Sequence, residues 1–134
     1  MIDHTGVIVS DLEKSKIFYS AALGAIGISI LKELSASVTG SADVVGYGAQ
    51  ETTTQGVSPE FWLSQGIPGN IPVHVAFRVG NRALVDAFYQ AALTAGGRDN
   101  GAPGLRPQYH PNYYGAFVRD PDGNNIEAVC RTPA

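Results

Sequence analysis

The chain has 134 residues, of which 44% are hydrophobic and 16% are charged, so it is long enough for one domain and too apolar to be disordered by charge. Nine basic against twelve acidic residues give a formal net charge of −3, so we expect neither nucleic acid nor a membrane as partner. The single cysteine, Cys130, excludes an internal disulfide, and no apolar run approaches the roughly 18 residues of a membrane helix. We therefore expect a small, soluble, cytoplasmic protein with many turns.

The two halves of the chain repeat each other. His4 and His74 align at an offset of 70 positions, and the same offset aligns residues 18–25 (FYSAALGA) with residues 88–95 (FYQAALTA). Six of these eight positions are identical, without a gap. The repeat predicts two modules, at about residues 1–66 and 70–134, within a single domain spanning 1–134.

The first half is predicted to begin with a strand over residues 2–9, which places its valines on one face and His4 on the other. The segment Ser10–Glu13 has the pattern of a capping box and predicts a helix that ends near Leu23. A polar loop at residues 50–58 is expected to be mobile. Three short strands are predicted near residues 26–34, 41–48 and 59–65.

The second half follows the same order. Its first strand has apolar residues at alternate positions from Val73 to Val79, so His74 projects from the opposite face. Asn81 is a suitable N-cap for the second helix, and Asp120–Gly123 (DPDG) predicts a hairpin turn. Further strands are predicted near residues 98–103, 113–119 and 124–130. Each half is thus β-α-β-β-β, and we predict an α+β fold in which two tandem modules form curved mixed sheets around a cleft.

The paired histidines are the strongest functional signal. His4 and His74 recur on the same face of equivalent strands, and imidazole is the commonest transition-metal ligand in proteins. Glu127 would complete an open site of two histidines and a carboxylate if the non-core face of the last strand turns into the same cleft. The alternative is that each histidine is a half-buried strand residue bonded to a neighbour. We predict a metal site formed by His4, His74 and Glu127.

The paired modules, the strand-borne histidines and the segment Asp120–Glu127 (DPDGNNIE) together resemble the vicinal oxygen chelate superfamily. This group includes glyoxalase I, bleomycin-resistance proteins, fosfomycin-resistance enzymes and extradiol dioxygenases, and the resemblance covers essentially the whole chain. In metal-dependent members the ligands come from the first and last strands of each module, and His4, His74 and Glu127 match three of those positions. The resemblance implies a divalent ion (zinc, nickel, iron, manganese or cobalt) and a homodimer.

The resemblance also implies a fourth ligand position, for which two alignments compete. Alignment on apolar residues places Trp62 there, which cannot bind a metal, whereas alignment of residues 59–61 with 126–128 places Glu60 there. Both residues have the same strand parity, so both are predicted to face the cleft and contact substrate. Trp62 could equally be a core residue.

The segment 106–114 concentrates polar and aromatic residues before a predicted strand. Arg106 could hold an anionic group of the substrate, with Tyr113 as a stacking wall, while His110 or Tyr114 transfers a proton together with Glu127. The alternative is an exposed loop that packs its own tyrosines. The six arginines and three lysines are spread along the sequence, so they indicate no cluster.

The resemblance implies a divalent-metal-dependent, glyoxalase-like enzyme: a lyase, isomerase or thiol transferase acting on a small molecule with two adjacent oxygens. Two alternatives stay open, a metal-free binding protein of the bleomycin-resistance type and an iron(II) extradiol dioxygenase. A purely structural dimerisation domain would leave the paired histidines unexplained.

Overall fold

The computed structural model describes residues 1–49 and 58–134 and confirms the α+β class with two similar modules. All of the predicted loop at 50–58 except Ser58 lies outside the described residues. The described part has no helix long and apolar enough to cross a membrane. The helices are α1 (Leu12–Gly24), α2 (Ala36–Thr39) and α3 (Arg82–Thr94).

Each module contributes one four-stranded mixed sheet. The strand orders are β1-β4-β3-β2 and β5-β8-β7-β6, and in both sheets the first and last strands of the module run parallel to each other. This shared topology is the structural counterpart of the sequence repeat. The short helix α2 was not predicted. The strands are β1 (Thr5–Val9), β2 (Ile28–Leu34), β3 (Val44–Ala49), β4 (Phe61–Gln65), β5 (His74–Arg78), β6 (Arg98–Leu105), β7 (Tyr114–Arg119) and β8 (Asn125–Cys130).

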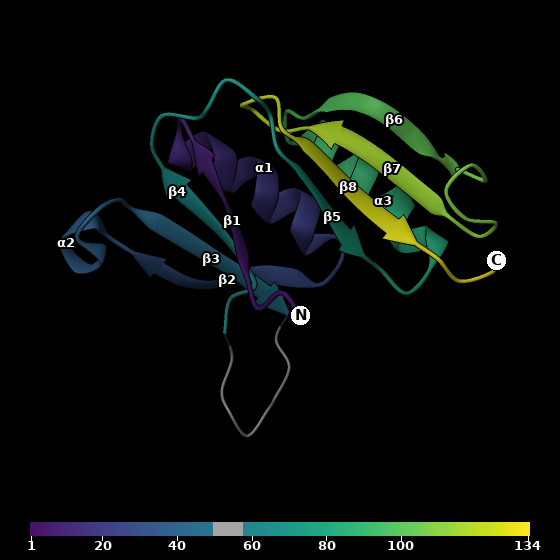
Figure 1. Cartoon of the computed structure of the whole chain (residues 1–134), viewed down its shortest axis with the longest axis horizontal. Coiled ribbons are helices and arrows are strands. Elements are labelled where there is room, and N and C mark those ends of the chain that lie inside the picture. Colours follow the sequence, from purple (N-terminus) through teal and green to yellow (C-terminus); the bar gives the residue numbers. More distant parts are fainter. Residues whose placement is uncertain (50–57) are drawn as a thin grey trace.

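The two sheets lie side by side, and α1 and α3 pack against each other behind them (Figure 1). Apolar strand residues of both modules pack with the helices in one core, and Phe61 of β4 meets Phe77 of β5 with ring centroids 5.3 Å apart. Burial of this continuous apolar surface is the main force that joins the modules. The other strand residues, including His74, therefore face away from the helices.

The helix starts show one confirmed and one wrong prediction. Asn81 caps α3 by accepting a hydrogen bond from the backbone N–H of Leu84, as predicted. In α1 the cap is Asp11 rather than Ser10, because Ser10 is engaged elsewhere: its backbone N–H and its hydroxyl both donate to Asp122 of the second module. The residue that was expected to begin a helix instead links the two halves.

The predicted DPDG hairpin is confirmed, and it also bridges the modules. The turn joins β7 to β8, and Gly123 adopts the left-handed backbone that the turn requires, with a φ of 87°. The buried carboxylate of Asp120 accepts hydrogen bonds from the backbone N–H groups of Asp122 and Asn124. It also accepts one, at 2.5 Å, from the hydroxyl of Tyr19 in α1. A local turn thus fixes the orientation of one module on the other.

Candidate functional site

His74 and Glu127 form the centre of the candidate site. They project from the parallel neighbours β5 and β8, where the register pairs His74 with Asn125 and Ala76 with Glu127. The Nε2 atom of His74 lies 3.1 Å from Oε1 of Glu127, and Nδ1 lies 3.0 Å from the carbonyl oxygen of Asn125. Because a carbonyl oxygen can only accept, Nδ1 carries a proton and donates it to Asn125. Nε2 is thereby directed at the carboxylate.

Tyr113 holds the other oxygen of this carboxylate. The side chain of Glu127 is 2% exposed, and its Oε2 accepts a hydrogen bond from the Tyr113 hydroxyl. Burial and the neighbouring Glu127 raise the pKa of Tyr113 to about 12, so the phenol stays protonated and remains a donor at neutral pH. Glu127 therefore has a phenol donor at one oxygen and a ring nitrogen of His74 within 3.1 Å of the other.

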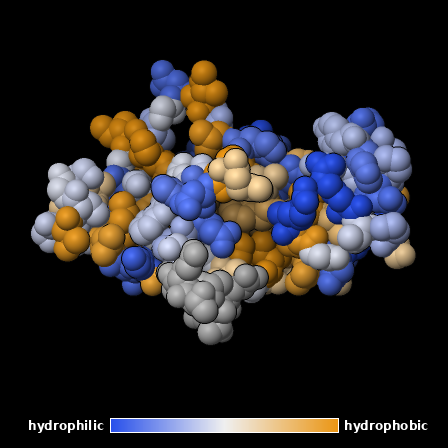
Figure 2. Space-filling model, turned by 60° about the horizontal axis from the view of Figure 1, so that its bottom comes forward, coloured by the Kyte–Doolittle hydropathy of each residue, from blue (hydrophilic) through white to orange (hydrophobic). Residues whose placement is uncertain are grey.

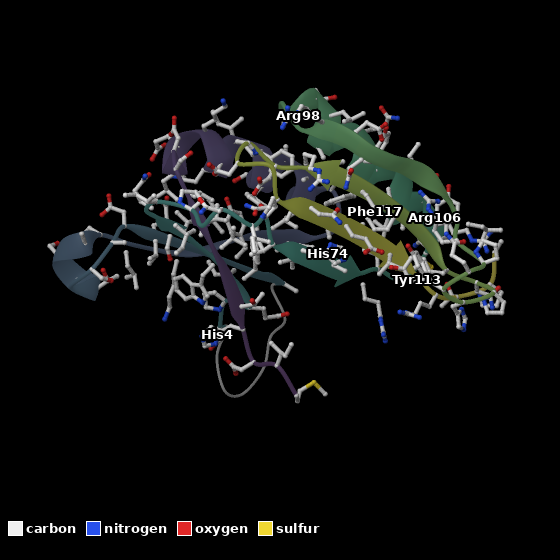
Figure 3. The ribbon with its side chains drawn as sticks, turned by 45° about the horizontal axis from the view of Figure 1, so that its top comes forward. His4, His74, Arg98, Arg106, Tyr113 and Phe117 are labelled. Carbon is white, nitrogen blue, oxygen red and sulfur yellow. The ribbon has the colours of Figure 1, made fainter. Side chains whose placement is uncertain are left out.

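An open cavity lies over this pair. It has a volume of about 370 Å³, within the range of small-molecule sites. Phe117 forms part of the wall and lies beside His74, with ring centroids 6.3 Å apart and ring planes 26° apart. Figure 3 shows His74, Phe117 and Tyr113 grouped on the second sheet. The residues that line the cavity are His74, Tyr109, Tyr113, Phe117, Asn125, Glu127 and Arg131.

A second cavity adjoins His74 on the side of the first sheet. It also measures about 370 Å³, and it is bordered by Asp3 and Glu60 from the first module and by Ala76 from β5. Figure 2 shows hydrophobic residues (orange) in the recess near the middle of this face, with strongly hydrophilic residues (deep blue) on the side of the second sheet. His74 lines both cavities.

His4 does not join His74 and Glu127. It precedes β1, its side chain is 59% exposed, and its Nδ1 is paired with Asp3 at 2.6 Å. Figure 3 shows it at the N-terminal stretch, apart from the second sheet. Within residues 1–49 and 58–134, no three His, Cys, Asp or Glu side chains are grouped so as to hold a metal ion.

The donor atoms that are present fit part of a metal site. Two ligands about 2.0–2.2 Å from one ion at a right angle to each other lie about 3 Å apart, and His74 and Glu127 have this separation, 3.1 Å. One chain therefore brings together two of the three predicted ligands. The third, His4, directly precedes the first strand of the other sheet, whose position is set by packing between the modules rather than by strand register.

The two candidates for the fourth ligand position lie along the first sheet. Glu60 is exposed and borders the cavity beside His74. Trp62 is half-buried and lies against Gly46, where an added Cβ would come 2.9 Å from the indole ring and 2.7 Å from Pro59. Only glycine leaves room at position 46 for this close approach, so the indole ring of Trp62 packs against the backbone of β3.

His110 and Tyr114 lie away from the His74–Glu127 pair. Nδ1 of His110 accepts a hydrogen bond from the backbone N–H of Asn112 within its own loop. The hydroxyl of Tyr114 donates to Asp86 of α3, on the helix side of the sheet. Neither residue lines either cavity. Strand alternation puts Tyr113, and not its neighbour, beside Glu127.

Four residues that line the cavity over the pair were not predicted as site residues: Tyr109, Phe117, Asn125 and Arg131. Phe117 lies directly opposite Glu127 in the β7–β8 hairpin, and Arg131 lies over the ring of Tyr113 with its guanidinium carbon 5.0 Å from the ring centroid. Arg131 has the same parity as Glu127, and the hairpin turn fixes the register of Phe117, so both carried a usable sequence signal. Asn125, whose carbonyl orients His74, carried none, because that contact depends on pairing between distant strands.

Comparison with known proteins identifies the family of the chain. The sequence model of the Glyoxalase/Bleomycin resistance protein/Dioxygenase superfamily matches residues 1–128. A crystal structure of a glyoxalase/bleomycin resistance protein from Albidiferax ferrireducens is 29% identical, with a TM-score of 0.69 over 97% of this chain and 98% of that one. No match was found among proteins of curated function. Fold and sequence together define a protein of two paired β-α-β-β-β modules, and the chain belongs to this superfamily.

More distant structures share the fold. A glyoxalase I mutant from Zea mays is 23% identical, with a TM-score of 0.67, and the match covers 96% of this chain and 46% of that one. A glyoxalase/bleomycin resistance protein/dioxygenase family enzyme from Burkholderia phytofirmans is 15% identical, with a TM-score of 0.66 over 98% of both chains. At these identities the likeness concerns the arrangement of the strands and helices.

Proposed function

We propose that the protein is a divalent-metal-dependent, glyoxalase-like enzyme, a lyase, isomerase or thiol transferase, that acts on a small molecule with two adjacent oxygens. The single observation that carries the proposal is the His74–Glu127 pair, whose donor atoms lie 3.1 Å apart at the edge of an open cavity. Membership in the superfamily supports the reaction class. If His74 and Glu127 only supported the fold, there would be no need to bury a carboxylate beside an imidazole.

In this proposal His74 and Glu127 hold the ion, through Nε2 and a carboxylate oxygen. A bound divalent ion polarises substrate oxygens and stabilises negative charge that develops on them. Tyr113 keeps Glu127 oriented, and Asn125 fixes the His74 tautomer through its carbonyl oxygen. Phe117 and Tyr109 supply an apolar wall for the substrate.

We propose that His4 of the partner subunit supplies the third ligand in a homodimer. His4 is exposed and directly precedes β1, the edge strand of the first sheet, while His74 begins β5, the edge strand of the second. A second copy could place β1 of one chain opposite β5 of the other. The resulting site would combine His4 from the first module of one chain with His74 and Glu127 from the second module of the other chain.

Metal analysis tests this assignment. The protein, purified without chelator, is expected to bind one ion per chain from a titration with zinc, nickel, cobalt or manganese. His4→Ala, His74→Ala and Glu127→Gln should each remove most of the binding, whereas His110→Ala should retain it. Metal that stays bound in His74→Ala would contradict the proposal.

Mixing tests the sharing of the site. When His4→Ala and His74→Ala proteins are combined after partial unfolding, mixed dimers have one intact site, so about a quarter of the wild-type binding should return. A site within one chain would give no recovery.

A second candidate function is metal-free ligand binding of the bleomycin-resistance type. It is favoured by the fact that Glu127 already has two partners in the single chain, Tyr113 and His74. In that case the protein would stay metal-free in all titrations and bind planar compounds against Phe117 and Trp62. Binding of such a compound without metal, unchanged in His4→Ala, would support this alternative.

A further inference from the structure

Five of the six arginines project from one face of the second sheet. Arg78 is the last residue of β5 and lies between Phe77 and Val79, which face the core, so its side chain is on the His74 face. Arg119 pairs with Asn125, and Arg98 pairs with Arg119, which places both on that same face. Arg106 and Arg131 complete the set through their contacts with Phe117 and Tyr113.

Arg106 and Arg131 are connected to the His74–Glu127 pair through one aromatic ring each. The guanidinium carbon of Arg106 lies 5.5 Å from the centroid of Phe117, whose ring faces His74. Arg131 lies in the same way over Tyr113, which is bonded to Glu127. Figure 3 shows Arg106 beside Phe117 and Tyr113. Two cations therefore lie near the site, each supported on an aromatic ring. Arg131 lines the cavity itself, whereas Arg106 lies on Phe117 of its wall and donates one guanidinium N–H to the carbonyl oxygen of Ala102.

The positive charge on this face is not balanced by acidic side chains. Glu127 projects from it, but its carboxylate is already bonded to His74 and Tyr113. Asp99 of β6 faces the opposite side, where it accepts a hydrogen bond from Tyr89 of α3. Among residues 1–49 and 58–134, no arginine has a carboxylate within ion-pair distance. Such a surface attracts anions, although the chain as a whole has a formal net charge of −3.

We propose that this face binds a small organic molecule with two anionic groups, carboxylates or phosphates, which span the His74–Glu127 pair between Arg106 and Arg131. Guanidinium forks match the oxygens of both groups, and the rings of Tyr109 and Phe117 favour a planar body between them. The proposal rests on the proposed function in one respect, since it places the substrate of that function in the same cavity. It restricts that substrate to dianions.

Calorimetric titration with simple probes tests the charge requirement. The probes are benzamide, benzoate, phthalate, phenyl phosphate and benzene-1,2-diyl bisphosphate, titrated into the full-length protein with and without added zinc. Phthalate should bind at least about tenfold more tightly than benzoate, the bisphosphate at least about tenfold more tightly than phenyl phosphate, and benzamide most weakly. The tighter of the two probes with two anionic groups, phthalate or the bisphosphate, identifies the anionic group. Equal affinity for benzamide and both dianions would overturn the proposal.

Arginine variants test the location. Arg106→Gln and Arg131→Gln should each weaken dianion binding about tenfold without changing the metal content, while Arg82→Gln, which removes an arginine stacked on Tyr114 at the helix side, should not. Arg106→Lys checks for a folding defect, because it keeps the charge and should lose only part of the affinity. An equal loss in Arg82→Gln, or displacement of phthalate by a short DNA duplex, would overturn the proposal.

These readouts separate the two proposals. Dianion binding in metal-free protein that depends on Arg106 and Arg131 supports the arginine face even if no metal ever binds. Metal binding that depends on His74, without any preference for dianions, supports the proposed function and contradicts this inference.

Discussion

Glu127 shows how a buried carboxylate is stabilised on one face of a sheet. A buried charge is strongly destabilising unless hydrogen bonds and an opposite charge compensate the lost hydration. Here Tyr113 donates to one oxygen and His74 lies at the other. Each partner is therefore needed by the carboxylate as well as by the site.

Tyr113→Phe tests this dependence at the level of one hydroxyl. The variant leaves one oxygen of a buried carboxylate without its donor, and the free energy of unfolding should fall by about 1–3 kcal/mol. Urea denaturation measures the change. Tyr109→Phe is the matched control, because the Tyr109 side chain is 63% exposed, and its effect should be close to zero. Equal effects of the two variants would show that the hydroxyl does not support Glu127.

Tyr19 is expected to make the free energy of unfolding decrease with pH in the alkaline range. Burial, and then Asp120, raise the pKa of Tyr19 well above its ordinary value of 10.0. The folded protein keeps this proton at pH values where the unfolded chain releases it, so the stabilising contribution is complete below pH 10 and decreases as the pH rises further. The difference in unfolding free energy between the wild type and Tyr19→Phe should therefore shrink above that pH, as measured by urea denaturation at several pH values. A constant difference would contradict the assignment.

At the scale of elements, Gly97 sets the distance between α3, β6 and α1. A Cβ at this position would lie 2.5 Å from Cε2 of Phe18 and 2.8 Å from the carbonyl oxygen of Ala92. Gly97→Ala should therefore lower the unfolding free energy by about 1–3 kcal/mol, because backbone and a packed ring must move. Thermal and urea unfolding measure the loss.

Gly80→Ala provides the control for this prediction. No described atom lies within 4 Å of the Cβ that it would add, and its φ is not left-handed. The change in unfolding free energy should stay within about 0.5 kcal/mol. If both alanine variants behaved alike, close packing at Gly97 would not be the cause.

At the scale of the whole molecule, an apolar patch adjoins the edge strand β1. Ile8, Ile71 and Val73 are exposed by 50%, 85% and 44%, and they line one cavity together with Gly6 of β1. Exposed apolar patches of this kind commonly mark an interface. The patch lies beside the strand that leads from His4.

We therefore expect a dimer whose interface includes this patch. Sedimentation equilibrium at micromolar concentration should give twice the mass of one chain, and Ile8→Glu together with Ile71→Glu should give a monomer that no longer binds metal. Lys14→Glu, which changes the charge of α1, is expected to stay dimeric. A wild-type monomer would contradict the shared site of His4 and His74.

The parts of the fold that depend on local pattern were predictable. The DPDG turn gave its hairpin, and Asn81 gave its helix cap, because both act through backbone groups a few residues away. The failure at Ser10 has a tertiary cause, since this side chain bonds Asp122, 112 positions along the chain. Tyr114 was predicted to transfer a proton because the segment contains two adjacent tyrosines. The alternation of side chains along the strand decides which of them reaches Glu127, and it is Tyr113.

The sequence by itself determined the repeat and the placement of His74 and Glu127 on the non-core face of their strands, because both follow from periodicity along the chain. The tertiary structure alone decided that His4 lies apart from them, since the distance between the sheets depends on packing between helices and turns. It also decided that arginines scattered from position 78 to position 131 share one face, because that requires the register of four strands at once. The distance between the sheets and the register of these strands both depend on contacts between residues far apart in the chain, so the local sequence pattern does not predict them.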